Sequence, residues 1–177
     1  MIGFHDESGI SERPVVRTTW APKGHTPILI STGSWKSLSM SGVIITTTKG
    51  TRSRLFLTIF HGSMHGKDFV SYLKQLKRHL AGRKLLLIWD GLPAHRARLV
   101  TSYVQTQQKW LRLARLPGYA PELNPIEYLW SAMKTRDISG LPVQGLAKLK
   151  QAIRRSRRRI NSDQKLLAGF LRASELY

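Results

Sequence analysis

The chain has 177 residues, of which 41% are hydrophobic, and this length and composition suit one folded domain with a sizeable core. No run approaches the roughly 18 apolar residues of a membrane span, and the absence of cysteine excludes disulfides and thiolate metal sites and fits a reducing cytosol. Twenty-nine Lys and Arg against ten Asp and Glu give a formal charge of +19, which favours binding to a polyanion, usually nucleic acid. With no charged-then-apolar leader, we expect a cytoplasmic protein.

Residues 1–8 predict a first strand. Ile2, Phe4 and Asp6 alternate onto one face of it, and Glu7 falls on the other. A carboxylate at the end of an apolar strand is either a solvated strand end or a site residue, and both interpretations stay open at this point.

Two more strands and a helix are predicted next. Residues 37–48 and 53–60 are rich in Val, Ile, Thr and Phe on either side of a short turn, which indicates an antiparallel hairpin. Residues 66–81 place apolar side chains on one side of a helix and cations on the other, and Gly82 ends it. The chain therefore begins with three strands and a helix.

Residues 84–90 predict a buried parallel strand, because apolar side chains occupy both of its faces. The strand ends on Asp90, after which glycine and proline break the chain. Ligand sites in open α/β sheets gather at the carboxyl ends of such strands. Asp90 is therefore a candidate site residue.

A helix around 94–108 and a strand at 111–116 come next, and the turn-rich sequence LPGYAPELNPIEYLW follows. Asn124 before Pro125 suits an N-cap followed by proline at the first helical position. Glu127 is thereby held near the start of a helix. Half of a capping box is the simpler interpretation of Glu127, and the two other marked carboxylates favour a site.

The C-terminal part, about 141–177, predicts two basic helices in the same domain. The helix at 145–160 has one apolar stripe, and its other side carries cations and no acid: Lys148, Lys150, Arg154, Arg155, Arg157, Arg158 and Arg159. A solvated face is the alternative, but seven like charges repel one another, so phosphate binding is favoured and the five arginines are candidate DNA contacts. A final helix at 162–176 is expected, with Ser162 as its cap.

Three carboxylates meet if the first and fourth strands are neighbours. Asp6 and Asp90 then project at one edge of the sheet, and the later helix brings Glu127 to them. Such a cluster repels itself unless cations neutralise it, and oxygen ligands without His or Cys indicate Mg²⁺ or Mn²⁺. Two such ions about 3.5–4 Å apart activate a water or a 3′-hydroxyl in phosphodiester chemistry.

Three blocks resemble the acidic motifs of DDE transposases in the mariner-like superfamily of insertion sequences: HDESG at 5–9, IWDGLPAHRA at 88–97 and LPGYAPELNPIEYLW at 116–130. TTWAPKGHTP at 18–27 resembles the loop after the first acid. The resemblance implies an α/β, RNase H-like fold: a central mixed sheet of three antiparallel strands and then two parallel strands, flanked by helices.

The resemblance also implies a function. Asp6, Asp90 and Glu127 match the metal-binding catalytic triad, which uses Mg²⁺, with Mn²⁺ as a substitute, as a pair of ions. The implied reaction is DNA cleavage and strand transfer at the ends of a bacterial insertion sequence, in the nucleoid and without a covalent protein–DNA intermediate. Element ends and target DNA are the expected partners, and a homodimer would pair the ends. His95 is a candidate DNA contact or helix cap, and Glu7 and Glu122 are near-misses to the triad.

Family members carry helix-turn-helix modules ahead of the catalytic domain, and here the first acid is the sixth residue. We therefore expect an excised catalytic domain, or a split-frame product whose helix-turn-helix module is a separate subunit. Three alternatives stay open: a metal-dependent nuclease or junction resolvase of the same fold, a non-catalytic DNA-binding remnant, and an RNA-binding or ribosomal protein. The last of these leaves Asp90 unexplained.

Overall fold

The computed structural model describes residues 1–13, 18, 20–28, 36–118, 120–140 and 145–174. Its centre is a five-stranded sheet of order β3-β2-β1-β4-β5, in which β1 and β2, and β2 and β3, pair antiparallel while β4 and β5 run parallel to β1. The strands are β1 (Ile2–Ser11), β2 (Ser37–Thr46), β3 (Ser53–His61), β4 (Leu85–Trp89) and β5 (Leu111–Arg115). The expected mixed sheet is confirmed.

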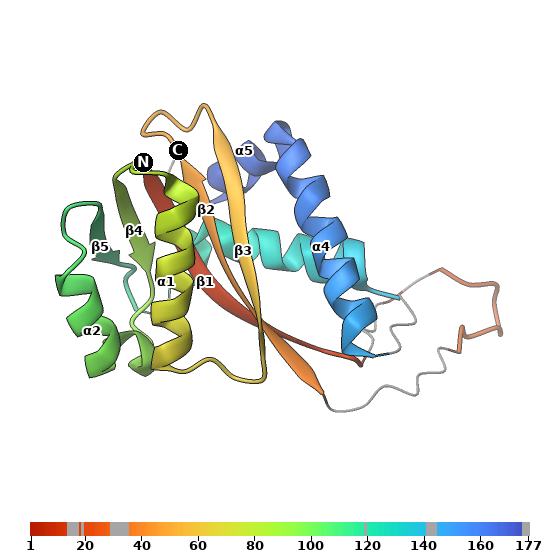
Figure 1. Cartoon of the computed structure of the whole chain (residues 1–177). Helices are drawn as coiled ribbons and strands as arrows, with labels where there is room; N and C mark the ends of the chain where they lie inside the picture. Colours follow the sequence, from red (N-terminus) through yellow and green to blue (C-terminus); the bar gives the residue numbers. More distant parts are fainter. Residues whose placement is uncertain (14–17, 19, 29–35, 119, 141–144, 175–177) are drawn as a thin grey trace.

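Helices cover both faces of the sheet (Figure 1). Two of them, α1 (Gly66–Leu80) and α2 (Arg98–Gln105), pack one hydrophobic core against one face. Three more, α3 (Pro125–Ala132), α4 (Leu146–Ser162) and α5 (Gln164–Ala173), pack a second core against the opposite face. Short turns of 3₁₀ helix, η1 (Pro93–Arg96) and η2 (Pro121–Leu123), precede α2 and α3, and α3 continues into a π-helical segment, η3 (Met133–Ile138).

Several boundaries differ from the sequence-based expectations. β1 runs on to Ser11 because its pairing with β2 continues that far, so Asp6 lies inside the strand and not at its end. The helix expected at 94–108 is broken at Ala97, whose ψ of 139° is extended. The last helix is capped by Asp163, whose side chain accepts from the backbone N–H of Leu166, because Ser162 still belongs to α4.

A glycine lets α3 lie close to the sheet. Gly42 on β2 is the pairing partner of Asp6, and a Cβ atom built on it would lie 2.8 Å from Cη2 of Trp130 and 3.2 Å from Cδ1 of Ile126. Carbon atoms in contact are ordinarily about 3.5–4.0 Å apart. The indole of Trp130 therefore occupies the space that a side chain at position 42 would need.

The outer edge of the sheet at β3 is completed by side chains. Asn161 accepts from the backbone N–H of Leu55 at 2.7 Å and donates to its carbonyl at 2.9 Å. Gln164 makes the same pair of bonds to Ser53, at 3.1 and 2.9 Å. These two amide groups take the place that a neighbouring strand would fill, so part of the edge has no free backbone groups.

Residues 20–28, between β1 and β2, extend away from the body of the molecule (Figure 1). Trp20 is fully exposed there and Ile28 is 87% exposed. The loop predicted over 11–35 lies partly outside the described residues. Within the described part of the chain, each helix is too short or too polar to span a bilayer.

Candidate active site

Asp6 points to the face of the sheet that α3 covers. The residue is 9% exposed, and its Oδ2 accepts a hydrogen bond of 2.9 Å from Nε1 of Trp130. Burial, together with repulsion from Glu127 and Glu7, raises the pKa of Asp6 to about 7, although the bond from Trp130 acts in the opposite direction. Asp6 is thus a carboxyl group close to other carboxylates, with its charge poorly compensated.

Glu127 lies in the first turn of α3 and is exposed. The helix begins at Asn124, as the sequence predicted, with the side-chain Oδ1 accepting from the N–H of Ile126 at 3.5 Å. Asn124 is buried, and its Nδ2 also donates to the carbonyl of His5 at 3.4 Å. The start of α3 is therefore attached to β1 one residue before Asp6, which keeps Glu127 near that carboxyl group.

Asp90 follows β4, which pairs with β1 in the register Phe4 to Ile88. The pairing ends there, two residues before Asp90, so it brings the end of β4 next to β1 near Asp6, while the side chain of Asp90 is bonded to His95. Oδ1 of Asp90 accepts from Nδ1 of His95 at 2.8 Å and from the N–H of Leu92 at 3.1 Å. Burial alone would raise the pKa of Asp90, but these hydrogen bonds outweigh it and hold that pKa below its usual value.

On the α1 face of the sheet, opposite the side chain of Asp6, β1 presents His5 and Glu7. Oε1 of Glu7 lies 2.9 Å from Nε2 of His95 and 3.5 Å from Nε2 of His5, which in turn lies 2.9 Å from Oγ of Ser41. Burial lowers the pKa of His5 to about 4, so this ring is neutral near pH 7. Glu7 faces away from Asp6, as its place in the strand predicted.

Sequence reasoning singled out His95 but not its surroundings. The structure buries it, with 4% of the residue exposed, and both ring nitrogens lie against carboxylates, so it offers no surface to DNA in this arrangement. Trp130 and Asn124, which hold Asp6 and Glu127, were missed as site residues. The strict alternation of β1 was the available signal for His5, because it sets His5 and Glu7 on one face.

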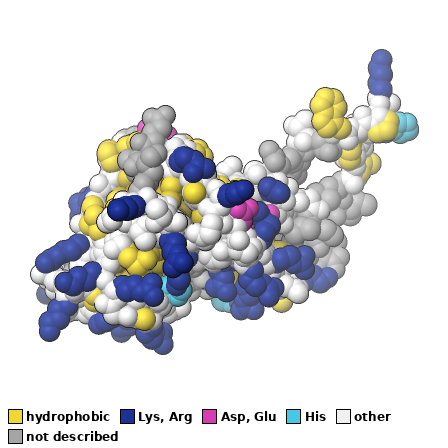
Figure 2. All heavy atoms as spheres, turned by 90° about the horizontal axis from the view of Figure 1, so that it is seen from above, with side chains coloured by type: hydrophobic (Ala, Val, Ile, Leu, Met, Phe, Trp, Pro, Cys, Tyr) yellow, Lys and Arg dark blue, Asp and Glu magenta, His cyan; other side chains and the backbone are white. Residues whose placement is uncertain are grey.

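The basic side chains form a surface of their own. On α4, Arg154, Arg155 and Arg158 are exposed, whereas Arg157 donates to the carbonyl of Leu57 at 3.5 Å and Arg159 pairs with Asp137 at 2.8 Å. Large groups of Lys and Arg side chains cover the face drawn in Figure 2, where few acidic groups are visible.

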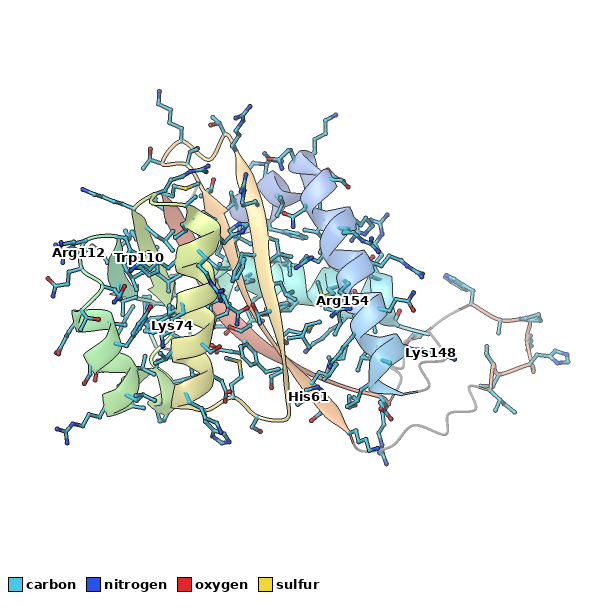
Figure 3. All side chains as sticks on the ribbon, viewed as in Figure 1. His61, Lys74, Trp110, Arg112, Lys148 and Arg154 are labelled. Atoms are coloured by element: carbon cyan, nitrogen blue, oxygen red, sulfur yellow. The ribbon has the colours of Figure 1, made fainter. Side chains whose placement is uncertain are left out.

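A groove runs between α4, β3 and α1. It is lined by Phe56, Leu57, Thr58, Ile59, Gln75, Lys150, Arg154 and Arg157. Figure 3 labels Arg154 of this lining on α4, together with Lys148 on the same helix and His61 at the end of β3. The lining contains three cations and no acid, which suits a polyanion.

Residues 1–150 match the family described as DDE superfamily endonuclease, and the chain belongs to that family. A relative in Shigella sonnei, the insertion element IS630 uncharacterized 39 kDa protein, is 24% identical over 131 residues, which are 73% of this chain and 36% of that protein. The chain thus spans about a third of the length of this curated relative.

Solved structures of Mos1 share the fold. The mariner Mos1 paired end complex with Mg superposes with a TM-score of 0.70 at 15% identity, over 98% of this chain and 53% of that one. The catalytic domain of Mos1 mariner transposase superposes with a TM-score of 0.61 at 14% identity, over 99% of this chain and 83% of that one. The expected RNase H-like fold is confirmed.

Proposed function

We propose that the chain is a transposase catalytic domain that cleaves DNA at the ends of an insertion sequence and joins them to target DNA. The observation that carries the proposal is the crowding of carboxylates around Asp6, next to Glu127 and one strand from Asp90. Membership of an endonuclease family and the fold shared with Mos1 support it.

Divalent metal ions fit this site. The raised pKa of Asp6, caused by burial and by its acidic neighbours, means that a nearby positive charge would stabilise the ionised form. We propose that Asp6, Asp90 and Glu127 hold two Mg²⁺ ions, for which Mn²⁺ can substitute. Paired end complexes of Mos1 with Mg and with Mn support the choice of metal. When bound, the ions supply activation of a water or 3′-hydroxyl and stabilisation of the leaving oxygen.

The chain's own residues set the geometry of that site. Trp130 holds one oxygen of Asp6, and Asn124 ties the start of α3 to β1, and these contacts support preorganisation of Asp6 and Glu127. In the first step water would be the nucleophile at the element end. The 3′-hydroxyl released there would attack target DNA in the second step.

A cleavage assay tests this function. The chain is incubated with Mn²⁺ and duplex DNA carrying the element end, together with any partner that recognises this end, and nicked and joined products are resolved on a denaturing gel. Asp90→Asn should abolish cleavage without weakening DNA binding, while Glu122→Gln, an exposed neighbour of the proposed site, serves as the matched control. Cleavage retained by Asp90→Asn would remove that residue from the site, and cleavage without joined products would favour the nuclease alternative.

We also propose that the exposed arginines of α4 bind the DNA backbone. Each phosphate contact contributes about 0.9 to the slope of log affinity against log salt concentration. Replacing Arg154, Arg155 and Arg158 together by Ala should lower the slope by about 3. Arg159→Ala, whose guanidinium is occupied by Asp137, is the control and should change it little. An unchanged slope in the triple variant would mean that these arginines of α4 do not contact the DNA.

The assembly is a further part of the proposal. The Mos1 paired-end complexes contain transposon-end DNA, and we propose that two copies of this chain act on two ends. Trp20 and Ile28, apolar and exposed on the extended loop, are suited to contacts between copies. A helix-turn-helix module, on a separate subunit or in a longer chain, would select the ends. Sedimentation with end DNA, for wild type and Trp20→Ala, measures the pairing.

A further inference from the structure

His95 is held rigidly by aromatic neighbours. Its ring stacks on that of Trp89, with centroids 4.3 Å apart and an interplanar angle of 3°, and it meets Phe69 edge-on at 4.6 Å. These contacts fix the plane of a buried ring, and the directions of its two ring nitrogens are fixed with it.

Both nitrogens lie against carboxylates. Nδ1 is 2.8 Å from Oδ1 of Asp90, and Nε2 is 2.9 Å from Oε1 of Glu7. A carboxylate oxygen accepts hydrogen bonds, so both ring nitrogens are placed to donate, Nδ1 to Asp90 and Nε2 to Glu7.

We propose that His95 is a positioning residue for the metal site, clamped by Glu7 on one side and orienting Asp90 on the other. The proposal rests on the proposed function, since it takes Asp90 as a metal ligand. His95 and the N–H of Leu92 both bond to Oδ1 of Asp90, and neither uses Oδ2. The carboxylate is thus fixed through one oxygen, and the other oxygen is left for ligation.

Glu7 acts one step further away. It does not touch Asp90, but its Oε1 fixes the far nitrogen of the same ring. Its place on the opposite face of β1 from Asp6, which separates it from the triad, is what allows it to reach His95. The hydrogen bonds from Glu7 to His95 and from His95 to Asp90 therefore link β1, which carries Asp6, to the residue that follows β4.

A second metal site is the competing interpretation of the same residues. Ligand atoms of His5, Glu7 and His95 all lie within 4.8 Å of one another, and two histidines with one glutamate are a known zinc set. However, a histidine that donates from both nitrogens has no lone pair to offer an ion. The hydrogen-bonded geometry therefore favours positioning over coordination by this cluster.

The test measures Mn²⁺ affinity of the metal-free protein by electron paramagnetic resonance, without DNA. His95→Phe keeps the aromatic packing and removes both donors, and Glu7→Gln removes the remote charge. Loss of such partners typically weakens metal binding about 10–100-fold, so we expect that range for His95→Phe and a smaller loss for Glu7→Gln. His79→Phe, an exposed histidine on α1, is the matched control and should bind as the wild type does.

A double-mutant cycle separates positioning from general structural damage. In an Asp90→Asn background, His95→Phe should cause no further loss of Mn²⁺ affinity, because the group it orients is no longer a ligand. Full affinity in His95→Phe, or an equal loss with and without Asp90, would overturn the proposal. Tight binding of Zn²⁺ that Glu7→Gln and His5→Ala abolish would overturn it in favour of a second metal site.

The failure of the proposed function has a different signature. If the wild type binds no Mn²⁺, the metal site itself is wrong. The two hydrogen bonds of His95 are then tested by ¹⁵N spectra of its ring, in which the Nδ1 signal should change in Asp90→Asn and the Nε2 signal in Glu7→Gln. Ring signals that stay unchanged in both variants would overturn the proposal whatever the metal result.

Discussion

Gly42→Ala should disturb the geometry of the site although it replaces no acidic residue. The new Cβ would lie 2.8 Å from Cη2 and 3.1 Å from Cζ2 of Trp130. Ordinary carbon contacts begin at about 3.5 Å, so the indole must move by roughly 0.7 Å. Overpacking of this kind costs about 1–3 kcal/mol, which for a domain of 150–250 residues lowers the melting temperature by about 2–12 °C.

The same movement strains the bond from Trp130 to Oδ2 of Asp6, so Mn²⁺ affinity should fall together with stability. Calorimetry and Mn²⁺ titration compare the stability and the Mn²⁺ affinity of Gly42→Ala with those of a control variant, Gly9→Ala. Gly9→Ala, in β1, adds a Cβ that meets nothing within 4 Å and measures the effect of alanine in a strand without a clash.

Trp130→Phe identifies the atoms responsible, because it deletes both clashing ring carbons and the N–H donor. In that background Gly42→Ala should cost at least about 1 kcal/mol less than in the wild type, a coupling of the size expected for residues in contact. Equal costs in the two backgrounds, or a Gly42→Ala variant as stable as Gly9→Ala, would refute the packing explanation.

Three further outcomes are expected. Because the pKa of Asp6 is raised from 3.8 to about 7, the stability that its protonated form contributes without metal is full below about pH 4 and is lost as pH rises through 7. Denaturation in EDTA should show a loss on the order of 4 kcal/mol, which should be absent in Asp6→Asn. Asn161→Ala and Gln164→Ala should each cost about 1–3 kcal/mol in urea unfolding, because the backbone groups of β3 lose their partners; no change would mean that water replaces the amides. Arg159→Ala should cost on the order of 1 kcal/mol, since it leaves Asp137 partly buried with one partner fewer.

The succession of strands along the chain could be predicted from the sequence, and so could the place of Asp90 directly after β4, because a short apolar run that ends on an acid is a local pattern. The sequence could not place the end of β1, since the length of pairing with β2 decides where that strand stops. Asp6 was therefore expected at a strand end and is found inside the strand.

The environment of His95 was also beyond local pattern. The turn at 93–96 places His95 against Glu7 of β1, which is 88 positions away in the chain. Charge patterning on α4 suggested one uniform face, but Asp137, from η3, pairs with Arg159. In both cases the deciding partner comes from a different element.

The capped edge of β3 has a consequence for biosynthesis. The amides that complete it belong to Asn161 and Gln164, 106 and 111 positions after their partners and beyond the 150 residues that match the family. While the chain is being made, β3 carries unpaired backbone groups that could pair with another molecule. A chain truncated before these residues would expose the edge of β3 and could aggregate through it. The edge is therefore protected only once the last two helices have been synthesised and folded.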